Sequence, residues 1–381
     1  MKVATGLAIG TAPAPELAAQ AVEAAMAKAN IHAPSSVLLF LTSEFAADPQ
    51  SAIKAAAKAA SCTQIIGCSA TGIFTEEDWV IDSPAAAAMV FSDLNFSHES
   101  NGHDLLLTLT APNAINTTWL NNSGLNNSDL NITALNSPEK KSSPRFGGVS
   151  GDAIGQGLFS VWQNGKGNTQ GYCEVALQNM HAAVAASHGL QLISSPRRIT
   201  ACEGNDLLGL ANLAALSTLY IACQKYDISG EDLPYHQLMA VHASKASLIE
   251  RGEYNLAALI IENTENNSVT LTKPLKVGDW LSWAVRDVDA AQIDIVKTAS
   301  VLRRQLEAEP EFALLFSCLG RGPYFYNGTD QDLALIKTLF PELPIIGFYG
   351  NGEIAPMNGA NELLQYSAVL GLFAKSNVVK L

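Results

Sequence analysis

Positive charge is scarce in this sequence, and no basic run or stripe occurs. The 381 residues include 23 Lys and Arg against 36 Asp and Glu, which gives a net charge of −13. Because nucleic-acid binding needs clustered positive charge, we expect no nucleic-acid partner. Charged residues total only 15%, against about a quarter in ordinary soluble domains. Alanine is abundant instead, so either small neutral side chains cover the surface or part of the surface is buried in an oligomer.

Long apolar runs and sorting signals are also missing. No stretch of about 18 uninterrupted apolar residues occurs, so no membrane insertion is predicted. Near the start, Gly10, Pro13 and Pro15 interrupt the chain before an apolar run of signal-peptide length can form. We therefore expect a soluble, cytoplasmic protein. Its seven Asn-X-Ser/Thr sequons then predict no glycosylation.

The six cysteines form no C-x-x-C pair, so neither a disulfide framework nor a zinc site is predicted. We expect no metal and no cofactor. One enzymatic alternative is a thiol-dependent or hydrolytic reaction in which Cys68 or Cys318 is the nucleophile, provided that a histidine such as His188 lies beside it. The segment GCSATG is not a G-x-S-x-G nucleophile elbow, because Thr71 stands where the second glycine belongs.

The sequence does contain alternating strand and helix patterns. Residues 36–41 and 63–67 are predicted strands, and residues 48–61 between them a helix with Asp48 as N-cap and Pro49 at its first position. The glycine-rich segment 67–74 and an apolar strand at 85–91 follow. The same order returns in the second half of the chain: a strand at 312–317, a helix at 329–340 capped by Thr329, a strand at 343–347, a glycine-rich loop at 347–356 and a strand at 366–373.

This repeated order predicts an internal duplication. Phe91 lies 24 residues beyond Gly67, and Gly371 lies 24 beyond Gly347. A third copy is suggested by apolar or glycine-rich runs at 105–110, 146–153 and 171–177, with Gly171 placed 23 residues beyond Gly148. An Asn/Ser-rich insertion at 113–145 stretches this copy, and we expect it to be exposed, mobile and dispensable for folding.

Together these patterns predict a mixed α/β fold with helix-covered sheets in two related domains. Helices are expected at about 206–224 and 288–308, and strands at 256–261 and 268–272.

The glycine-rich loops carry the candidate binding residues. If the loop 317–328 and the loop 347–356 follow neighbouring strands, Arg321 and Glu353 lie on one rim. Arg321 has a five-donor fork suited to a ligand carboxylate, and Asn351 and backbone N–H groups would hold the rest of a small polar molecule. The alternative is that Arg321 only pairs with Glu353. The segment FGGVSGDA would cradle a phosphate, with Asp152 ordering a cation, or form a tight turn beside the pocket; no lysine follows, so it is not a P-loop.

The segments LLFSCLGRGPYFY, IIGFYGNGEIAP, GCSATG and FGGVSGD together resemble the FIST family, a two-part bacterial sensory module. The resemblance implies a FIST N-terminal part over about 30–225 and a FIST C-terminal part over about 230–374, which divides the chain into domains of residues 1–225 and 226–381. It also implies binding of small molecules such as amino acids. No kinase, cyclase, receiver or F-box segment is present, so the signal is expected to pass to a separate protein. The sequence departs from the family at Ala355, where relatives often have glycine, and at 363–367, so ligand specificity does not carry over.

The resulting expectation is a cytoplasmic, non-catalytic sensor of a small polar ligand. The alternatives are the enzyme already described, a scaffold whose glycines serve only packing, and a haem-binding sensor, although the seven dispersed histidines single out no haem ligand. The candidate ligand-binding residues are Cys68, Ser69, Gly148, Ser150, Asp152, Cys318, Arg321, Tyr324, Gly350, Asn351, Gly352 and Glu353.

Overall fold

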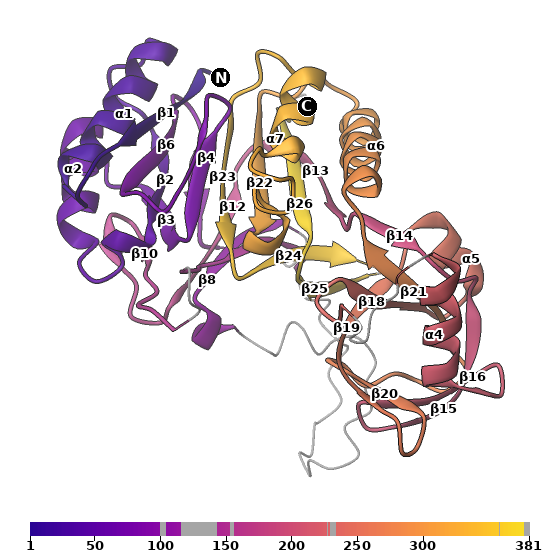
Figure 1. Cartoon of the computed structure of the whole chain (residues 1–381). Helices are drawn as coiled ribbons and strands as arrows, with labels where there is room; N and C mark the ends of the chain where they lie inside the picture. Colours follow the sequence, from indigo (N-terminus) through magenta and orange to yellow (C-terminus); the bar gives the residue numbers. More distant parts are fainter. Residues whose placement is uncertain are drawn as a thin grey trace, which may run out of the picture. The chain divides into compact units, whose positions relative to one another are not determined.

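The computed structural model describes residues 1–99, 104–115, 143–152, 156–226, 228, 234–357 and 359–376. The predicted mixed α and β class is confirmed, with helices and strands in two compact units (Figure 1). The first unit comprises residues 1–188 and 294–381, and the second comprises residues 189–293. Most of the predicted insertion, residues 116–142, lies outside the described residues.

The described residues of the first unit form three six-stranded sheets. Sheet 1 has the order β1-β6-β2-β3-β10-β11, sheet 2 the order β13-β26-β22-β23-β4-β5, and sheet 3 the order β7-β12-β8-β9-β24-β25. The strands of sheet 1 are β1 (Val3–Ile9), β2 (Ser36–Thr42), β3 (Ile65–Ala70), β6 (Ala85–Phe91), β10 (Val161–Gln163) and β11 (Lys166–Gly167). Those of sheet 2 are β4 (Gly72–Thr75), β5 (Trp79–Ile81), β13 (Met180–Ser187), β22 (Phe312–Cys318), β23 (Ile345–Gly350) and β26 (Ala368–Lys375). Those of sheet 3 are β7 (Phe96–Ser97), β8 (Leu106–Thr110), β9 (Arg145–Val149), β12 (Tyr172–Leu177), β24 (Gly352–Met357) and β25 (Ala360–Leu364).

All three sheets follow one plan. Each is built on a parallel pair, β2 with β3, β22 with β23, or β8 with β9. An antiparallel strand flanks one side of each pair, and a strand from a hairpin flanks the other. The hairpins are exchanged in a cycle: the chain leaves β3 of sheet 1 to form β4–β5 in sheet 2, leaves β23 of sheet 2 to form β24–β25 in sheet 3, and leaves β9 of sheet 3 to form β10–β11 in sheet 1.

One glycine marks the same place in each sheet. A Cβ on Gly67 would lie 1.7 Å from the carbonyl oxygen of Leu39, one on Gly147 would lie 1.9 Å from that of Thr108, and one on Gly347 would lie 1.8 Å from that of Leu315. Any side chain there would collide with the backbone of the neighbouring parallel strand. The equivalent glycine of sheet 3 is therefore Gly147, not Gly148.

The predicted equivalence of Phe91 with Gly371, based on the 24-residue offset, was wrong. Phe91 pairs with Ser36, the first residue of β2, whereas Gly371 pairs with Leu314, the third residue of β22. The duplication itself stays a prediction, which the common strand plan supports.

The three sheets pack on a shared phenylalanine core. Phe40 of sheet 1 and Phe146 of sheet 3 lie with ring centroids 6.4 Å and 6.1 Å from that of Phe316 in sheet 2. The helices α1 (Glu16–Ala29) and α2 (Gln50–Ala60) cover the other face of sheet 1, and α6 (Val288–Leu306) and α7 (Gln331–Leu339) pack on sheet 2 (Figure 1). Burial of this much apolar surface is the main stabilising contribution to the unit.

Alanine has a structural use that the composition did not reveal. Ala86 and Ala88 of β6 are completely buried and share a core cluster with the buried Ala18, Ala21 and Ala25 of α1. Ala85 and Ala87 are also completely buried, but they lie in the core on the other face of the sheet. Small side chains on the two facing surfaces let α1 lie close to its sheet, so part of the alanine lies between helix and sheet rather than on the surface.

The second unit is a closed antiparallel barrel. Its strands run β21-β15-β16-β20-β19-β18 and return to β21, with β14 and β17 attached. The bounds are β14 (Leu190–Leu192), β15 (Arg197–Glu203), β16 (Asp206–Leu210), β17 (Leu213–Ala214), β18 (Leu238–Ala243), β19 (Asn255–Asn263), β20 (Ser268–Leu271) and β21 (Trp280–Arg286), with helices α4 (Ala215–Lys225) and α5 (Ala246–Arg251). The helix predicted over 206–224 is wrong in its first half, where strands β16 and β17 occupy residues 206–214.

Other local predictions differ at caps and loops. Pro49 itself occupies the N-cap position of α2, without a side-chain cap bond, so Asp48 is not the cap. In α7 the cap is Asp330 rather than Thr329, since its side chain accepts a hydrogen bond from the N–H of Leu333. The segments 67–74 and 347–356 are largely strand: the chain bends only at Thr71 and Asn351 before the next strand begins.

Candidate ligand site

Arg321 lies just beyond β22 and is 1% exposed. Its Nε donates to Asp332 Oδ2 (2.9 Å), and one terminal nitrogen, Nη2, donates to Asp332 Oδ1 (3.1 Å). The other, Nη1, donates to the carbonyl of Ser187 (3.1 Å). Asp332 comes from α7 and Ser187 from the end of β13. Burial alone would lower the pKa of Arg321, but Asp332 and Tyr326 raise it, so the guanidinium stays charged. Its ion-pair partner is Asp332, not Glu353.

Glu353 of β24 is completely buried, and neither carboxylate oxygen has a hydrogen-bond partner among the described residues. Burial raises the pKa of Glu353 well above its usual range, although the charge of Arg321 and the nearby backbone N–H of Ser367, which does not meet hydrogen-bond geometry, oppose the shift. Arg321 therefore acts on Glu353 through space, without neutralising it in an ion pair. Burial thus favours the neutral carboxylic acid, which can donate and accept a hydrogen bond.

A second acid and two tyrosines surround the arginine. Asp330 accepts a hydrogen bond from the hydroxyl of Tyr349, and Tyr326 donates to Asp332 Oδ1 (2.7 Å). Burial, with the charge of Asp332 nearby, raises the pKa of Asp330 to about 6. The carboxyl ends of β22 and β23 thus meet a buried polar network centred on Arg321.

His188 follows β13 directly and is also buried. Its Nδ1 lies 3.0 Å from the hydroxyl oxygen of Ser367, and its backbone N–H donates to Asp294 Oδ2 (2.8 Å). Burial lowers the pKa of His188 to about 4; Asp294 opposes this shift and Arg321 adds to it. The imidazole is therefore neutral at neutral pH, and it is tied to Ser367 beside Glu353.

The lowered pKa of His188 predicts that the stability of the protein depends on pH. As pH falls from about 6.5 to about 4, the unfolded chain protonates its histidine before the folded protein does, so the unfolded state binds more protons and stability falls. Relative to His188→Gln, the wild type should lose up to about 3 kcal/mol across this range. Urea unfolding of both proteins at several pH values measures the difference. A constant difference would show that His188 titrates normally in the folded protein.

Three strand ends, one from each sheet, meet at a second cluster. Thr71, Gly151 and Asn351 each lie four residues beyond the equivalent glycines Gly67, Gly147 and Gly347. The N–H of Thr71 donates to the carbonyl of Tyr349 (3.2 Å), and the N–H of Asn351 donates to that of Val149 (3.0 Å). We call Thr71, Gly151 and Asn351 the three-sheet junction.

Two predicted serines lie beside this junction. The hydroxyl of Ser150 donates to the carbonyl of Ser69 (2.6 Å), and the N–H of Ser160 donates to the hydroxyl of Ser69 (3.0 Å). Both serines are fully buried and satisfied by protein atoms. Asp152 Oδ2 accepts from the N–H of Gly157 (2.6 Å), whereas its Oδ1 is buried without a partner among the described residues.

The structure separates other predicted site residues from these clusters. Tyr324 is 63% exposed and donates to Asp82. Cys68 lies in the core, and burial raises the pKa of its thiol well above the usual range, so it stays protonated. Cys318 is buried at the end of β22, where its N–H donates to the carbonyl of Ser367 (3.0 Å).

The predicted glycines meet protein atoms. A Cβ on Gly350 would lie 2.2 Å from the carbonyl oxygen of Val149, and one on Gly148 would lie 2.7 Å from the ring of Phe348. A Cβ on Gly352 would come no nearer than 3.0 Å to its neighbours, the closest being the carbonyl oxygen of Leu364. Gly350 and Gly148 therefore permit close packing, whichever ligand binds nearby.

Several cluster residues escaped the sequence analysis. Asp332 lies on a helix, and Ser187 and Ser367 come from strand ends far along the chain. His188 was considered only as the base for a cysteine nucleophile. Thr71 was noted only as breaking a nucleophile motif. The repeat offered one signal: counting four residues on from each glycine gives Thr71, Gly151 and Asn351 together.

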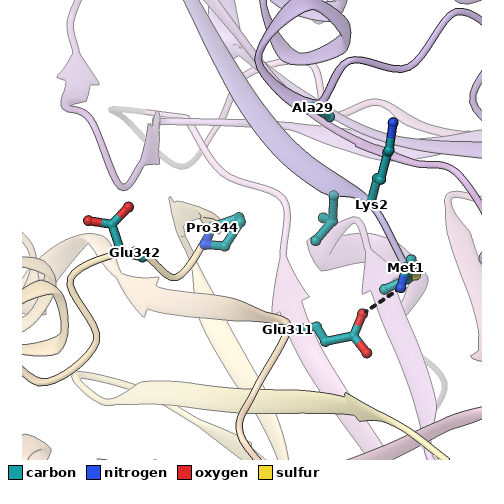
Figure 2. A pocket seen from close by; sticks show the side chains of 7 residues that line it. Met1, Lys2, Ala29, Glu311, Glu342 and Pro344 are labelled. Atoms are coloured by element: carbon teal, nitrogen blue, oxygen red, sulfur yellow. Dashed lines mark ion pairs between the residues drawn. The ribbon is translucent and has the colours of Figure 1, made fainter.

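A surface hollow of about 370 Å³ lies elsewhere, lined by Met1, Lys2, Val3, Ala29, Glu311, Glu342 and Pro344 (Figure 2). The amino group of Met1 lies 3.3 Å from Glu311 Oε2 there. None of the candidate ligand-binding residues lines it.

Comparison with known sequences decides the family. Residues 35–212 match the FIST N domain, and residues 214–356 match the FIST C domain. The chain belongs to the FIST family. FIST domains are sensory signal-transduction domains, and the predicted resemblance is confirmed. Both matches contribute to the Arg321 network, since Ser187 and His188 lie in FIST N and Arg321, Asp332 and Glu353 in FIST C.

Similar proteins occur in mycobacteria. An uncharacterized protein of Mycobacterium tuberculosis is 25% identical over 397 residues, covering 96% of this chain and 99% of that protein. An uncharacterized protein of Mycobacterium bovis is 26% identical over 229 residues, covering 60% of this chain and 59% of that protein.

The FIST N and FIST C matches meet near residue 213, whereas the compact units divide at 188 and 293. The predicted domain boundary at residue 225 stays a prediction. Among the described residues, no helix is long and apolar enough to span a membrane.

Proposed function

We propose that this FIST protein is a cytoplasmic, non-catalytic sensor that binds a small polar molecule beside Glu353 and passes the signal to a separate protein. The observation that carries the proposal is the unpartnered carboxyl group of Glu353. A buried polar group left without a hydrogen bond costs about 1–3 kcal/mol. Such groups are rare in folded proteins and call for a specific explanation.

The surroundings of Glu353 suit a polar ligand. The charge of Arg321 and the backbone N–H of Ser367 act on the carboxyl group, and His188 is held nearby through Ser367. A neutral acid next to a fixed positive charge recognises a group that both accepts and donates hydrogen bonds. A small carboxylic acid or an amino acid carries such groups. Thiol catalysis through Cys68 gains no support, because burial keeps its thiol protonated.

Binding is expected to raise the thermal unfolding midpoint. A ligand present at 100 times its Kd stabilises the folded protein by about 2.7 kcal/mol. Differential scanning fluorimetry with amino acids, nucleotides and small carboxylates should therefore yield at least one compound that shifts the midpoint. If this panel produces no shift, the scaffold alternative is favoured instead.

Glu353→Leu separates ligand binding from folding. The substitution removes an unsatisfied group, so the unfolding free energy of the unliganded protein should stay the same or rise. The ligand-induced shift should disappear. Glu174→Leu is the matched control: Glu174 is paired with Arg145 (2.6 Å), so its loss should lower stability and leave the ligand shift intact. A Glu353→Leu protein that is destabilised and still responds to the ligand would contradict the proposal.

A further inference from the structure

The chain enters and leaves the second unit at two points that hydrogen bonds tie together. The first crossing lies between His188 and Gly189. The second lies between Ile293 and Asp294, within the helix α6. Asp294 Oδ2 accepts hydrogen bonds from the hydroxyl of Ser187 (2.9 Å) and from the backbone N–H of His188 (2.8 Å). One carboxylate oxygen of α6 therefore holds the end of β13. We call Ser187, His188 and Asp294 the clasp.

The clasp is also bonded to the candidate ligand site. Arg321 donates to the carbonyl of Ser187 through Nη1 (3.1 Å) and to its hydroxyl oxygen through Nη2 (3.0 Å). The imidazole Nδ1 of His188 lies 3.0 Å from the hydroxyl oxygen of Ser367, whose backbone N–H lies near the carboxyl group of Glu353. Ser187 and Ser367 are completely buried, so solvent does not compete for these bonds. Two hydrogen-bonded routes thus lead from the ligand site into the clasp.

A further hydrogen bond, within the second unit, joins the same two segments. The carbonyl of Gly189 accepts from the backbone N–H of Asp287 (3.3 Å). Asp287 immediately precedes α6, and its carboxylate accepts from the N–H of Ala290 (2.7 Å), as an N-cap does. Asp287 and Asp294 are seven residues apart, about two helical turns, so both face the segment 187–189. Gly189 has a φ of 63°, a left-handed conformation that favours glycine, so the chain turns between the two ties.

We propose that Asp294 is a positioning residue that couples the ligand site to the second unit through the clasp. The hydroxyl of Ser187 accepts from Arg321 and donates to Asp294, so a change at the guanidinium reaches the carboxylate through one shared group. The state of the ligand site then sets how firmly the two ends of the second unit are held together. The inference deepens the proposed function by naming how binding is transmitted, and it rests on that proposal only for what occupies the site.

Hydrogen exchange of the full-length protein, measured by NMR without added ligand, tests this coupling. Ser367→Ala removes the hydroxyl that holds His188, and it should speed the exchange of the Asp287 amide about fivefold or more. In the Asp294→Ala background this amide should already exchange faster, and adding Ser367→Ala should then change its rate less than about twofold. If Ser367→Ala leaves the Asp287 amide unchanged, or accelerates it equally in both backgrounds, the proposal is overturned.

Three variants separate coupling from a merely structural role. Asp294→Asn keeps an oxygen that can accept both hydrogen bonds, so the response to Ser367→Ala should be retained. Asp289→Ala changes an exposed aspartate of the same helix and should also leave the response intact. Ser317→Ala removes a buried hydroxyl of sheet 2 that bonds to the next carbonyl along the chain (3.5 Å), and the Asp287 amide should not respond. If Ser317→Ala acts as Ser367→Ala does, the effect is a general loosening of the sheet and the proposal fails.

The two proposals can fail separately. Exchange is measured without ligand, so the coupling is found or refuted whatever the ligand panel gives. Coupling together with a panel that produces no midpoint shift would keep the role of the clasp and remove the sensor proposal. A compound that shifts the midpoint of a protein without this coupling would keep the sensor proposal and remove the role of the clasp.

Discussion

Replacing Arg321 with methionine is expected to lower the free energy of unfolding by about 3–5 kcal/mol, the usual cost of breaking a buried ion pair by removing one partner. Asp332 would be left charged or forced to take up a proton while 1% exposed. The carbonyl of Ser187 would lose its donor as well. Urea unfolding at neutral pH measures the loss.

The double variant Arg321→Met with Asp332→Leu distinguishes the pair from simple packing. It should recover part of the loss, because replacing both partners of a buried pair by apolar groups is often close to neutral. Arg321→Lys keeps the charge but not the planar fork, and it should fall between the wild type and Arg321→Met. The exposed pair of Arg251 with Glu253 is the control, and Arg251→Met should change stability little. If the Arg321→Met protein is as stable as the wild type, the guanidinium does not contribute to the free energy of unfolding.

The candidate site was only partly visible in the sequence. The sequence analysis selected Arg321, Asn351 and Glu353 because glycines surround them. In the structure, the charge of Arg321 acts on the carboxyl group of Glu353. The arginine's actual partner, Asp332, lies in a helix whose pattern reads as ordinary amphipathic sequence. Nothing in the chain between Ser187 and Arg321 indicates that these two residues touch. Long-range side-chain contacts of this kind depend on how sheets pack, which periodicity does not report.

The fold was visible to a similar degree. The parallel pairs β2–β3 and β22–β23 and the long helix α6 follow from apolar periodicity, and they lie close to where it predicts them. The exchange of hairpins between sheets could not be predicted, because the sequence after β3 shows only glycines and short apolar runs. Barrel strands such as β16 were mistaken for a helix because α4, which follows closely, extends the apolar pattern.

The common plan of the three sheets leads to the largest expected effect. Gly67→Ala should cost about 4 kcal/mol or more and largely prevent folding, because the new Cβ would lie 1.7 Å from the carbonyl oxygen of Leu39 on the central strand β2. Backbone atoms in a parallel pair cannot move aside without breaking the ladder of hydrogen bonds. Gly347→Ala should be as severe, since its Cβ would lie 1.8 Å from the carbonyl oxygen of Leu315. Gly167→Ala is the control, because a Cβ there would meet nothing within 4 Å. Expression yield, circular dichroism and urea unfolding of the three variants measure the effect. A Gly67→Ala protein that unfolds like the Gly167→Ala control would mean that β2 and β3 do not approach as closely as the structure has them, and the equivalence of Gly67 with Gly347 would lose its physical basis.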